Sequence, residues 1–196
     1  KQLYGEAYLV RFADDFLIMF QYERDAQRVY EAIIRRMELF GLELSKEKTR
    51  ILPFGRNCGT RETFDFLGFT HFNSKTRKGY YSVGHKISRK KKKQFKSNLK
   101  KWVKENRDKQ FDEFMKKLNK KLTGSFNYYS LSGMIREVRS LWIHSLYVTF
   151  KWMNRRSQRR SFKLERFYEI WNVRIIHPYI HVDIWSGDKV IYNKNV

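Results

Sequence analysis

The sequence has little of what marks a secreted or membrane protein. Its single cysteine, Cys58, excludes an internal disulfide and fits a reducing compartment. No stretch approaches the ~18 consecutive apolar residues that a transmembrane helix needs. The N-terminus also lacks the layout of a signal peptide. These absences predict an intracellular protein that has no membrane partner.

Acidic residues are scarce as well. The chain has 20 Asp and Glu against 42 Lys and Arg, for a formal net charge of +22. Such a charge repels itself in the folded protein and is relieved when a polyanion binds. Aromatic residues make up 17% of the chain, which excludes a disordered basic tail. No helix-turn-helix, zinc-finger or basic-zipper pattern occurs, so structured RNA is favoured over duplex DNA as the partner.

The first of three regions, residues 1–85, alternates strand and helix patterns and predicts an α+β unit. Two apolar arms, Tyr8–Phe12 and Phe16–Phe20, predict a β-hairpin. A helix follows, because apolar residues recur at helical spacing up to a terminal glycine. They are Ala26, Val29, Tyr30, Ile33, Met37, Phe40 and Gly41. Further strands are expected at residues 42–44, 49–54, 64–69 and 79–83.

The second region, residues 86–160, predicts a three-helix bundle with basic outer faces. A loop is expected at residues 123–133, before the third helix. Neither Pro53 nor Pro178, the two prolines of the chain, interrupts this region. In residues 161–196 we expect a helical segment that Pro178 ends and then a hairpin. No internal repeat or low-complexity linker occurs.

Asp14 and Asp15 lie side by side in the middle of the apolar run of residues 10–20. Such a run normally forms a buried hairpin, and two carboxylates at its tip are costly unless a cation neutralises them. Mg²⁺ binds carboxylate oxygens and serves phosphoryl-transfer enzymes in this way. The alternative is a β-turn in which Asp only suits the backbone.

Three motifs in order, with a helix after the first of them, resemble the second half of a reverse-transcriptase palm. The helical region that follows is similar to the thumb, or maturase-specific domain X, of bacterial group II intron-encoded proteins. The resemblance covers roughly residues 5–175. Its motifs are Phe-Ala-Asp-Asp at 12–15, Gly-Leu-Glu-Leu-Ser-Lys-Glu-Lys-Thr at 41–49, Phe-Leu-Gly-Phe at 66–69, Leu-Asn at 118–119, Phe-Asn-Tyr-Tyr at 126–129 and the Arg-rich residues 154–162. Phe12 stands where the family usually has tyrosine, and both rings pack without ligating a metal.

The resemblance implies RNA-directed DNA polymerisation by two-metal nucleotidyl transfer in the full-length protein. Asp14 would be the chief Mg²⁺ ligand with Asp15 beside or behind it, and Lys48 would neutralise the pyrophosphate of a dNTP. The primer grip would be Phe66, Leu67 and Gly68. A solvated lysine at Lys48 and a plain strand with a bulge at Gly68 stay open as alternatives.

The resemblance also implies binding of group II intron RNA for splicing, beside a DNA primer or target. Arginine suits phosphates, and exposed aromatic rings stack on unpaired bases. The candidates are Arg89, Lys90, Lys91, Lys92, Lys93, Tyr128, Tyr129, Arg155, Arg156, Arg159 and Arg160. A solvated charge run and tyrosines that only cap a core are the alternatives. The implied location is the bacterial cytoplasm or nucleoid.

The family scheme needs a further Asp on a strand upstream of the hairpin, and the sequence contains neither that strand nor the fingers. We therefore expect a piece of a longer enzyme that does not polymerise by itself. Asp65 is expected to be a paired strand acid, and Cys58 and the histidines do not have the pattern of a metal site. The alternative function is a non-catalytic RNA-binding splicing cofactor with a vestigial palm.

Overall fold

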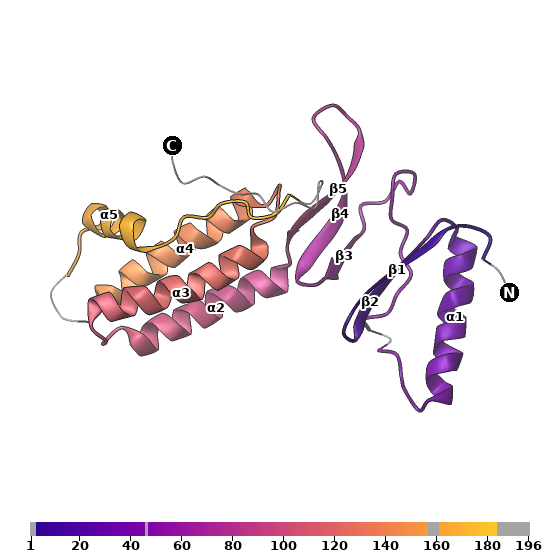
Figure 1. Cartoon of the computed structure of the whole chain (residues 1–196), viewed down its shortest axis with the longest axis horizontal. Coiled ribbons are helices and arrows are strands. Elements are labelled where there is room, and N and C mark those ends of the chain that lie inside the picture. The colour runs from indigo at the N-terminus through magenta and orange to yellow at the C-terminus, as the bar shows by residue number, and fades with distance from the viewer. Residues whose placement is uncertain (1–2, 46, 157–160, 184–196) are drawn as a thin grey trace. The chain divides into compact units, whose positions relative to one another are not determined.

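The computed structural model describes residues 3–45, 47–156 and 161–183 (Figure 1). The chain forms two compact units. Unit 1 comprises residues 1–67 and 71–84, and unit 2 comprises residues 68–70 and 85–196. Over the residues described, two small antiparallel sheets and five helices confirm the predicted α+β class. None of the helices in the described ranges is long and apolar enough to span a lipid bilayer. The predicted domains 1–85, 86–160 and 161–196 stay a prediction.

Unit 1 begins with the predicted hairpin. Strand β1 (Ala7–Phe12) pairs with β2 (Asp15–Phe20), and Phe12 lies opposite Asp15. A two-residue turn therefore joins the strands, and Ala13 in it has a φ of 53°. The predicted burial of the hairpin is wrong, because all six residues of β1 are exposed. The tip of the hairpin is thus open to solvent.

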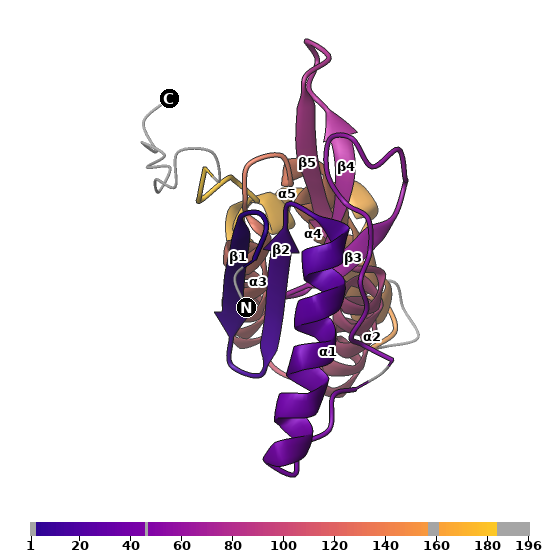
Figure 2. The ribbon, with the colours of Figure 1, turned by 90° about the vertical axis from the view of Figure 1, so that its right-hand side faces the viewer.

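Helix α1 (Glu23–Leu39) lies beside β2 (Figure 2). Its end confirms the glycine prediction, because Gly41 adopts a φ of 66° and donates its N–H to the carbonyl of Glu38 at 3.0 Å. Leu42 N–H donates to the carbonyl of Met37 at 2.9 Å, which completes a Schellman motif. In the first turn, the buried carboxylate of Asp25 accepts the N–H groups of two residues before β1. These are Tyr4 at 2.9 Å and Gly5 at 3.0 Å.

The second sheet has the strand order β3 (Thr63–Phe66), β4 (Phe69–Lys75) and β5 (Tyr81–Ile87). The single strand predicted at 64–69 is wrong, because Leu67 and Gly68 form a turn with φ values of 50° and 82°. Two successive residues with positive φ are typical of a tight hairpin turn.

The strands expected at 42–44 and 49–54 are also wrong, since both segments are irregular. The N–H groups of Lys48 and Thr49 both donate to the carbonyl of Ser45, so a turn uses groups that a strand pair would need. Pro53 removes a further donor from the second segment.

Unit 2 contains the predicted helices as α2 (Arg89–Asn106), α3 (Phe111–Tyr129) and α4 (Ile135–Met153), which lie side by side in Figure 1. Helix α5 (Leu164–Arg174) packs on α3 and α4 and corresponds to the expected helical segment before Pro178. Val182 forms a parallel bridge with Leu131. Most of the hairpin expected after His181 lies outside the described residues.

The loop predicted at 123–133 is wrong over its first half. Helix α3 continues to Tyr129 because Phe126 and Tyr129 extend its buried stripe past Leu122. In the described ranges the buried apolar residues all belong to unit 2. They are Ile87, Leu99, Val103, Phe114, Met115, Leu118, Leu122, Phe126, Tyr129, Met134, Val138, Leu141, Trp142, Leu146, Met153, Phe167, Trp171 and Ile175.

Candidate functional site

The hairpin of unit 1 presents two adjacent carboxylates to solvent. Asp14 lies in the turn and Asp15 is the first residue of β2, and both are exposed. Residues opposite each other in an antiparallel pair project to the same face, so Asp15 shares its face with Phe12. The two carboxylates therefore differ in backbone setting and need not play the same role.

These carboxylates have the oxygen chemistry that Mg²⁺ prefers, and an exposed tip leaves room for water and phosphate. Across the described part of the chain, however, no group of three His, Cys, Asp or Glu residues could hold a metal ion. Asp14 and Asp15 could thus supply some of the ligands of a two-metal site. Lys48, the third catalytic candidate, is exposed in the irregular segment after α1.

The structure divides the expected primer grip. Phe66 ends β3, and Leu67 and Gly68 form the turn. The carbonyl of Gly68 accepts the N–H of Ser88 at 2.9 Å, and Ser88 caps the N-terminus of α2. A Cβ atom at Gly68 would lie 3.4 Å from Cγ of Lys91. Gly68 and the basic tract at residues 89–93 are therefore neighbours in unit 2, although they belong to different sequence motifs.

The tract itself forms the first turn of α2. Lys92 is partly buried and pairs with Glu137 of α4, so one lysine of the five basic residues serves the bundle. The other four side chains are exposed at the start of the helix. We call Arg89, Lys90, Lys91 and Lys93 the helix-start cluster.

The two tyrosine candidates lie on the last turn of α3, with different surroundings. The ring of Tyr128 is 51% exposed and stacks on Phe69, with centroids 5.6 Å apart. Tyr129 is buried in the core and contacts Phe69 edge-on at 5.5 Å. Burial raises the pKa of the Tyr129 hydroxyl above its ordinary value. Tyr128 is thus the more exposed ring of the pair.

A second basic cluster surrounds Trp152 near the end of α4. Three cations lie within 6 Å of its ring centroid: Lys104 Nζ at 5.9 Å, Arg107 Cζ at 5.5 Å and Arg155 Cζ at 5.3 Å. Cations over an indole face gain from the ring quadrupole, which partly offsets their mutual repulsion. The ring therefore holds three like charges close together.

Arg156 joins the ends of two helices at the same place. Its Nη1 donates to the carbonyls of Arg107 at 3.2 Å and Lys109 at 3.4 Å. We call Trp152 with four neighbouring cations the Trp152 cluster; the cations are Lys104, Arg107, Arg155 and Arg156. Arg159 and Arg160, predicted with Arg155 and Arg156, lie outside the described residues.

Sequence reasoning missed two members of this cluster, Lys104 and Arg107. The available signal was weak, since Lys104 in the last turn of α2 and Arg107, the residue that caps this helix, are only three residues apart. Their approach to α4 depends on how the helices pack.

The chain matches two family models, one after the other along the sequence. Residues 1–71 match the model for reverse transcriptase (RNA-dependent DNA polymerase). Residues 92–169 match the model for the maturase-specific domain of group II introns. The chain belongs to the group II intron reverse transcriptase/maturase family. No curated protein matches it.

In this reverse transcriptase/maturase the two matches divide the candidates. The reverse-transcriptase match includes the carboxylate pair, Lys48 and the Gly68 turn. The maturase match includes Tyr128 and the Trp152 cluster. Reverse transcriptases generally use Mg²⁺, which agrees with the oxygen chemistry of the hairpin tip.

Proposed function

We propose that unit 2 of this reverse transcriptase/maturase binds intron RNA through the helix-start cluster and the Trp152 cluster. The observation that carries the proposal is the packing of Lys104, Arg107 and Arg155 around one indole ring. Such crowding of like charge costs stability in the free protein, and phosphates relieve it. Arginine forks and lysine ammonium groups there neutralise the RNA backbone.

The two clusters mark the two ends of one helix. Helix α2 has 18 residues, which correspond to a length of about 27 Å. An RNA that contacts both clusters therefore extends over at least this distance. Tyr128, exposed beside the Gly68 turn, adds a ring for stacking at the helix-start end.

We further propose that the hairpin of unit 1 supplies two carboxylates to the polymerase centre. Asp14 and Asp15 would hold Mg²⁺, which when bound activates the primer 3′-hydroxyl and stabilises the leaving pyrophosphate. Lys48 neutralises the triphosphate, and the turn after Phe66 contacts the primer. Glycine at position 68 suits the φ of 82° in this turn, and the side chain of Lys91 lies where a Cβ would point.

The 196-residue chain is expected to show no templated DNA synthesis with Mg²⁺ or Mn²⁺. The reason is that no third metal-ligating side chain joins Asp14 and Asp15 within the described ranges. The measurement is extension of a labelled primer on an RNA template by the purified chain. Clear extension would contradict this expectation and would mean that a second copy completes the centre.

RNA binding by the chain is expected to weaken steeply with salt. If about five phosphates are neutralised at ~0.7–0.9 counterions each, log K falls by roughly 4 per tenfold rise in salt. Fluorescence anisotropy with a folded intron RNA, at salt from about 50 to 200 mM, measures the slope. A wild-type chain that shows no salt-dependent binding would contradict the proposed function.

Two double variants test which lysine and arginine side chains contact the RNA. Lys104→Ala with Arg155→Ala removes two cations from the Trp152 cluster and is expected to reduce the slope by about 1.5. Lys116→Ala with Lys120→Ala removes two exposed lysines of α3 outside both clusters, and is expected to leave the slope almost unchanged. Equal effects of the two pairs would show that the charge acts diffusely.

A further inference from the structure

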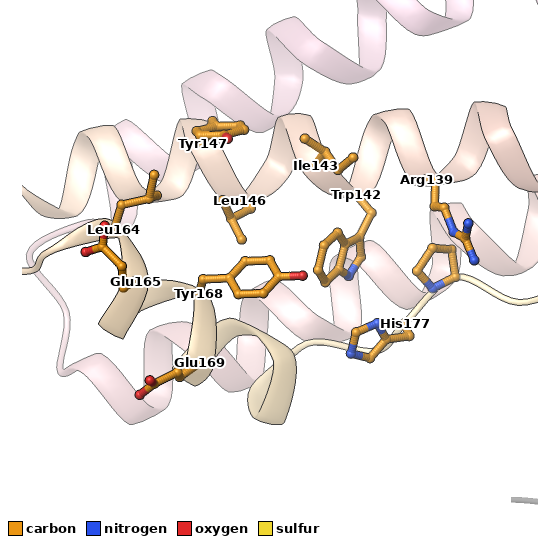
Figure 3. Close-up of a pocket in the computed structure, with 11 residues that line it drawn as sticks. Arg139, Trp142, Ile143, Leu146, Tyr147, Leu164, Glu165, Tyr168, Glu169 and His177 are labelled. Atoms are coloured by element: carbon orange, nitrogen blue, oxygen red, sulfur yellow. The ribbon is translucent and has the colours of Figure 1, made fainter. Parts of the chain in front are cut away.

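A groove of unit 2 lies between α4, α5 and the segment that follows α5 (Figure 3). Its volume is about 780 Å³, within the range of ~300–1,000 Å³ that small-ligand sites have. The clusters proposed to bind phosphates do not line it. The residues that matter for its chemistry are Arg139, Trp142, Tyr147, Glu165, Tyr168 and His177.

The floor of the groove is a fixed set of rings. Trp142 is buried, and its indole N–H donates to the carbonyl of Ile176 at 3.1 Å. The ring of His177 stacks on Trp142 with centroids 5.1 Å apart, and Tyr168 meets Trp142 edge-on at 6.3 Å. Because the tryptophan is held by a hydrogen bond and two rings, the floor is preorganised for a flat ligand.

The walls leave aromatic surface open to water. Tyr147 of α4 is 53% exposed and Tyr168 of α5 is 48% exposed, and both line the groove. Ile143, one turn before Tyr147, is 47% exposed at the same place. Large side chains gathered in a groove mark a binding site more often than isolated ones do. A planar ring laid on these side chains would cover them.

The polar groups that line the groove indicate which kind of flat ligand it would bind. Arg139 and Glu165 both line the groove and lie toward opposite ends of it in Figure 3. Glu169, the other acid of the lining, points away and pairs with Arg166 at 2.8 Å. A cation at one end suits a phosphate, and a carboxylate at the other accepts the exocyclic amino group of a base. Adenine, cytosine and guanine nucleotides carry an exocyclic amino group on the flat base and a phosphate on the ribose.

We infer that this groove binds one unpaired nucleotide of RNA, with its base on Tyr147 and Tyr168 and its phosphate at Arg139. The inference rests on the proposed RNA binding and adds a site for a single unstacked base. A chain of charge +22 draws an RNA strand over its surface, and the groove then captures a base that is not paired. An apolar peptide would cover the same rings but would leave Arg139 and Glu165 without counterparts.

The test compares two labelled RNAs that have equal numbers of phosphates, one single-stranded and one a blunt duplex, by anisotropy at one salt concentration. Tyr147→Ala with Tyr168→Ala is expected to weaken single-strand binding by about 5- to 150-fold, the effect of losing one stacked base. Duplex binding should not change. Tyr147→Phe with Tyr168→Phe keeps both rings and should bind like the wild type. Tyr80→Ala, an exposed tyrosine of unit 1, is the matched control.

Each outcome decides a separate point. If the wild-type chain binds neither RNA, the proposed function fails and this inference fails with it. If it binds both, and the double alanine variant loses nothing or loses equally on both RNAs, only the nucleotide site is overturned. A loss in the phenylalanine variant as large as in the alanine variant would also overturn it, since the rings are then not what binds. Circular dichroism melts of each variant show that unit 2 stays folded.

Discussion

Replacing Asp14 by alanine is expected to abolish primer extension by any protein that contains this chain and copies an RNA template. Asp14 lies in the exposed hairpin turn, where its carboxylate is free to approach Mg²⁺ and a triphosphate. Loss of a metal ligand removes stabilisation that acts in the transition state, and a rate loss of more than ~10²-fold is expected. RNA affinity should change little, because the basic clusters of unit 2 supply it.

Single-turnover extension and anisotropy on the same preparation separate these two effects. Glu31→Ala is the control, because Glu31 is an exposed acid of α1 in the same unit and its removal changes the charge equally. Asp15→Ala tests whether the second carboxylate, held in the strand pair opposite Phe12, has a lesser role. Ordinary polymerisation by the Asp14→Ala protein would show that the turn carboxylate is not part of the metal site.

Elements with a strong local signal could be predicted from the sequence. The hairpin follows from two apolar arms around Asp14 and Asp15, and α1 follows from a long helical stripe. Gly41 also marked the helix end correctly, because a left-handed residue there needs little more than the local chain. Each of these features depends on residues that are close together in the sequence.

Other features depend on packing and could not be predicted in the same way. Residues 123–125, Thr-Gly-Ser, are typical of a loop, yet buried Phe126 and Tyr129 keep α3 helical past them. The same packing buries Tyr129, and its predicted role in RNA binding stays a prediction. A short apolar stretch such as 49–54 carries no information on a partner strand. The strand predicted there is therefore wrong.

The Trp152 cluster likewise combines a residue that a local sequence pattern indicates with one that only the packing of the helices brings to it. Arg155 was identified from a local run of arginines, and Arg107 was not, although both lie over the Trp152 ring. The contact of Arg107 with Trp152 joins residues that are 45 positions apart in the sequence, so only the packing of α2 against α4 brings them together. Composition predicted that RNA binds, and the fold locates the charges that would bind it.

Phe114→Ala is expected to lower the free energy of unfolding of unit 2 by about 3–5 kcal/mol. Phe114 is fully buried in the core, and its ring centroid lies 5.3 Å from that of Trp102. Truncation removes apolar contact and leaves a cavity that the surrounding helices cannot fill without shifting. Phe114→Leu keeps most of the volume and should cost less, about 1.5 kcal/mol.

The tryptophans make this measurement specific to unit 2. Trp102, Trp142, Trp152 and Trp171 all lie in unit 2 and the sequence of unit 1 has no tryptophan, so tryptophan fluorescence in a urea titration reports the unfolding of unit 2. Phe40→Ala is the matched control, because Phe40 is 67% exposed at the end of α1 in unit 1 and its loss should change the free energy of unfolding by less than about 0.5 kcal/mol. Equal shifts would contradict the assignment of the core. Because folded unit 2 carries both basic clusters, saturating intron RNA should raise the midpoint of the wild-type and Phe114→Ala chains alike by mass action.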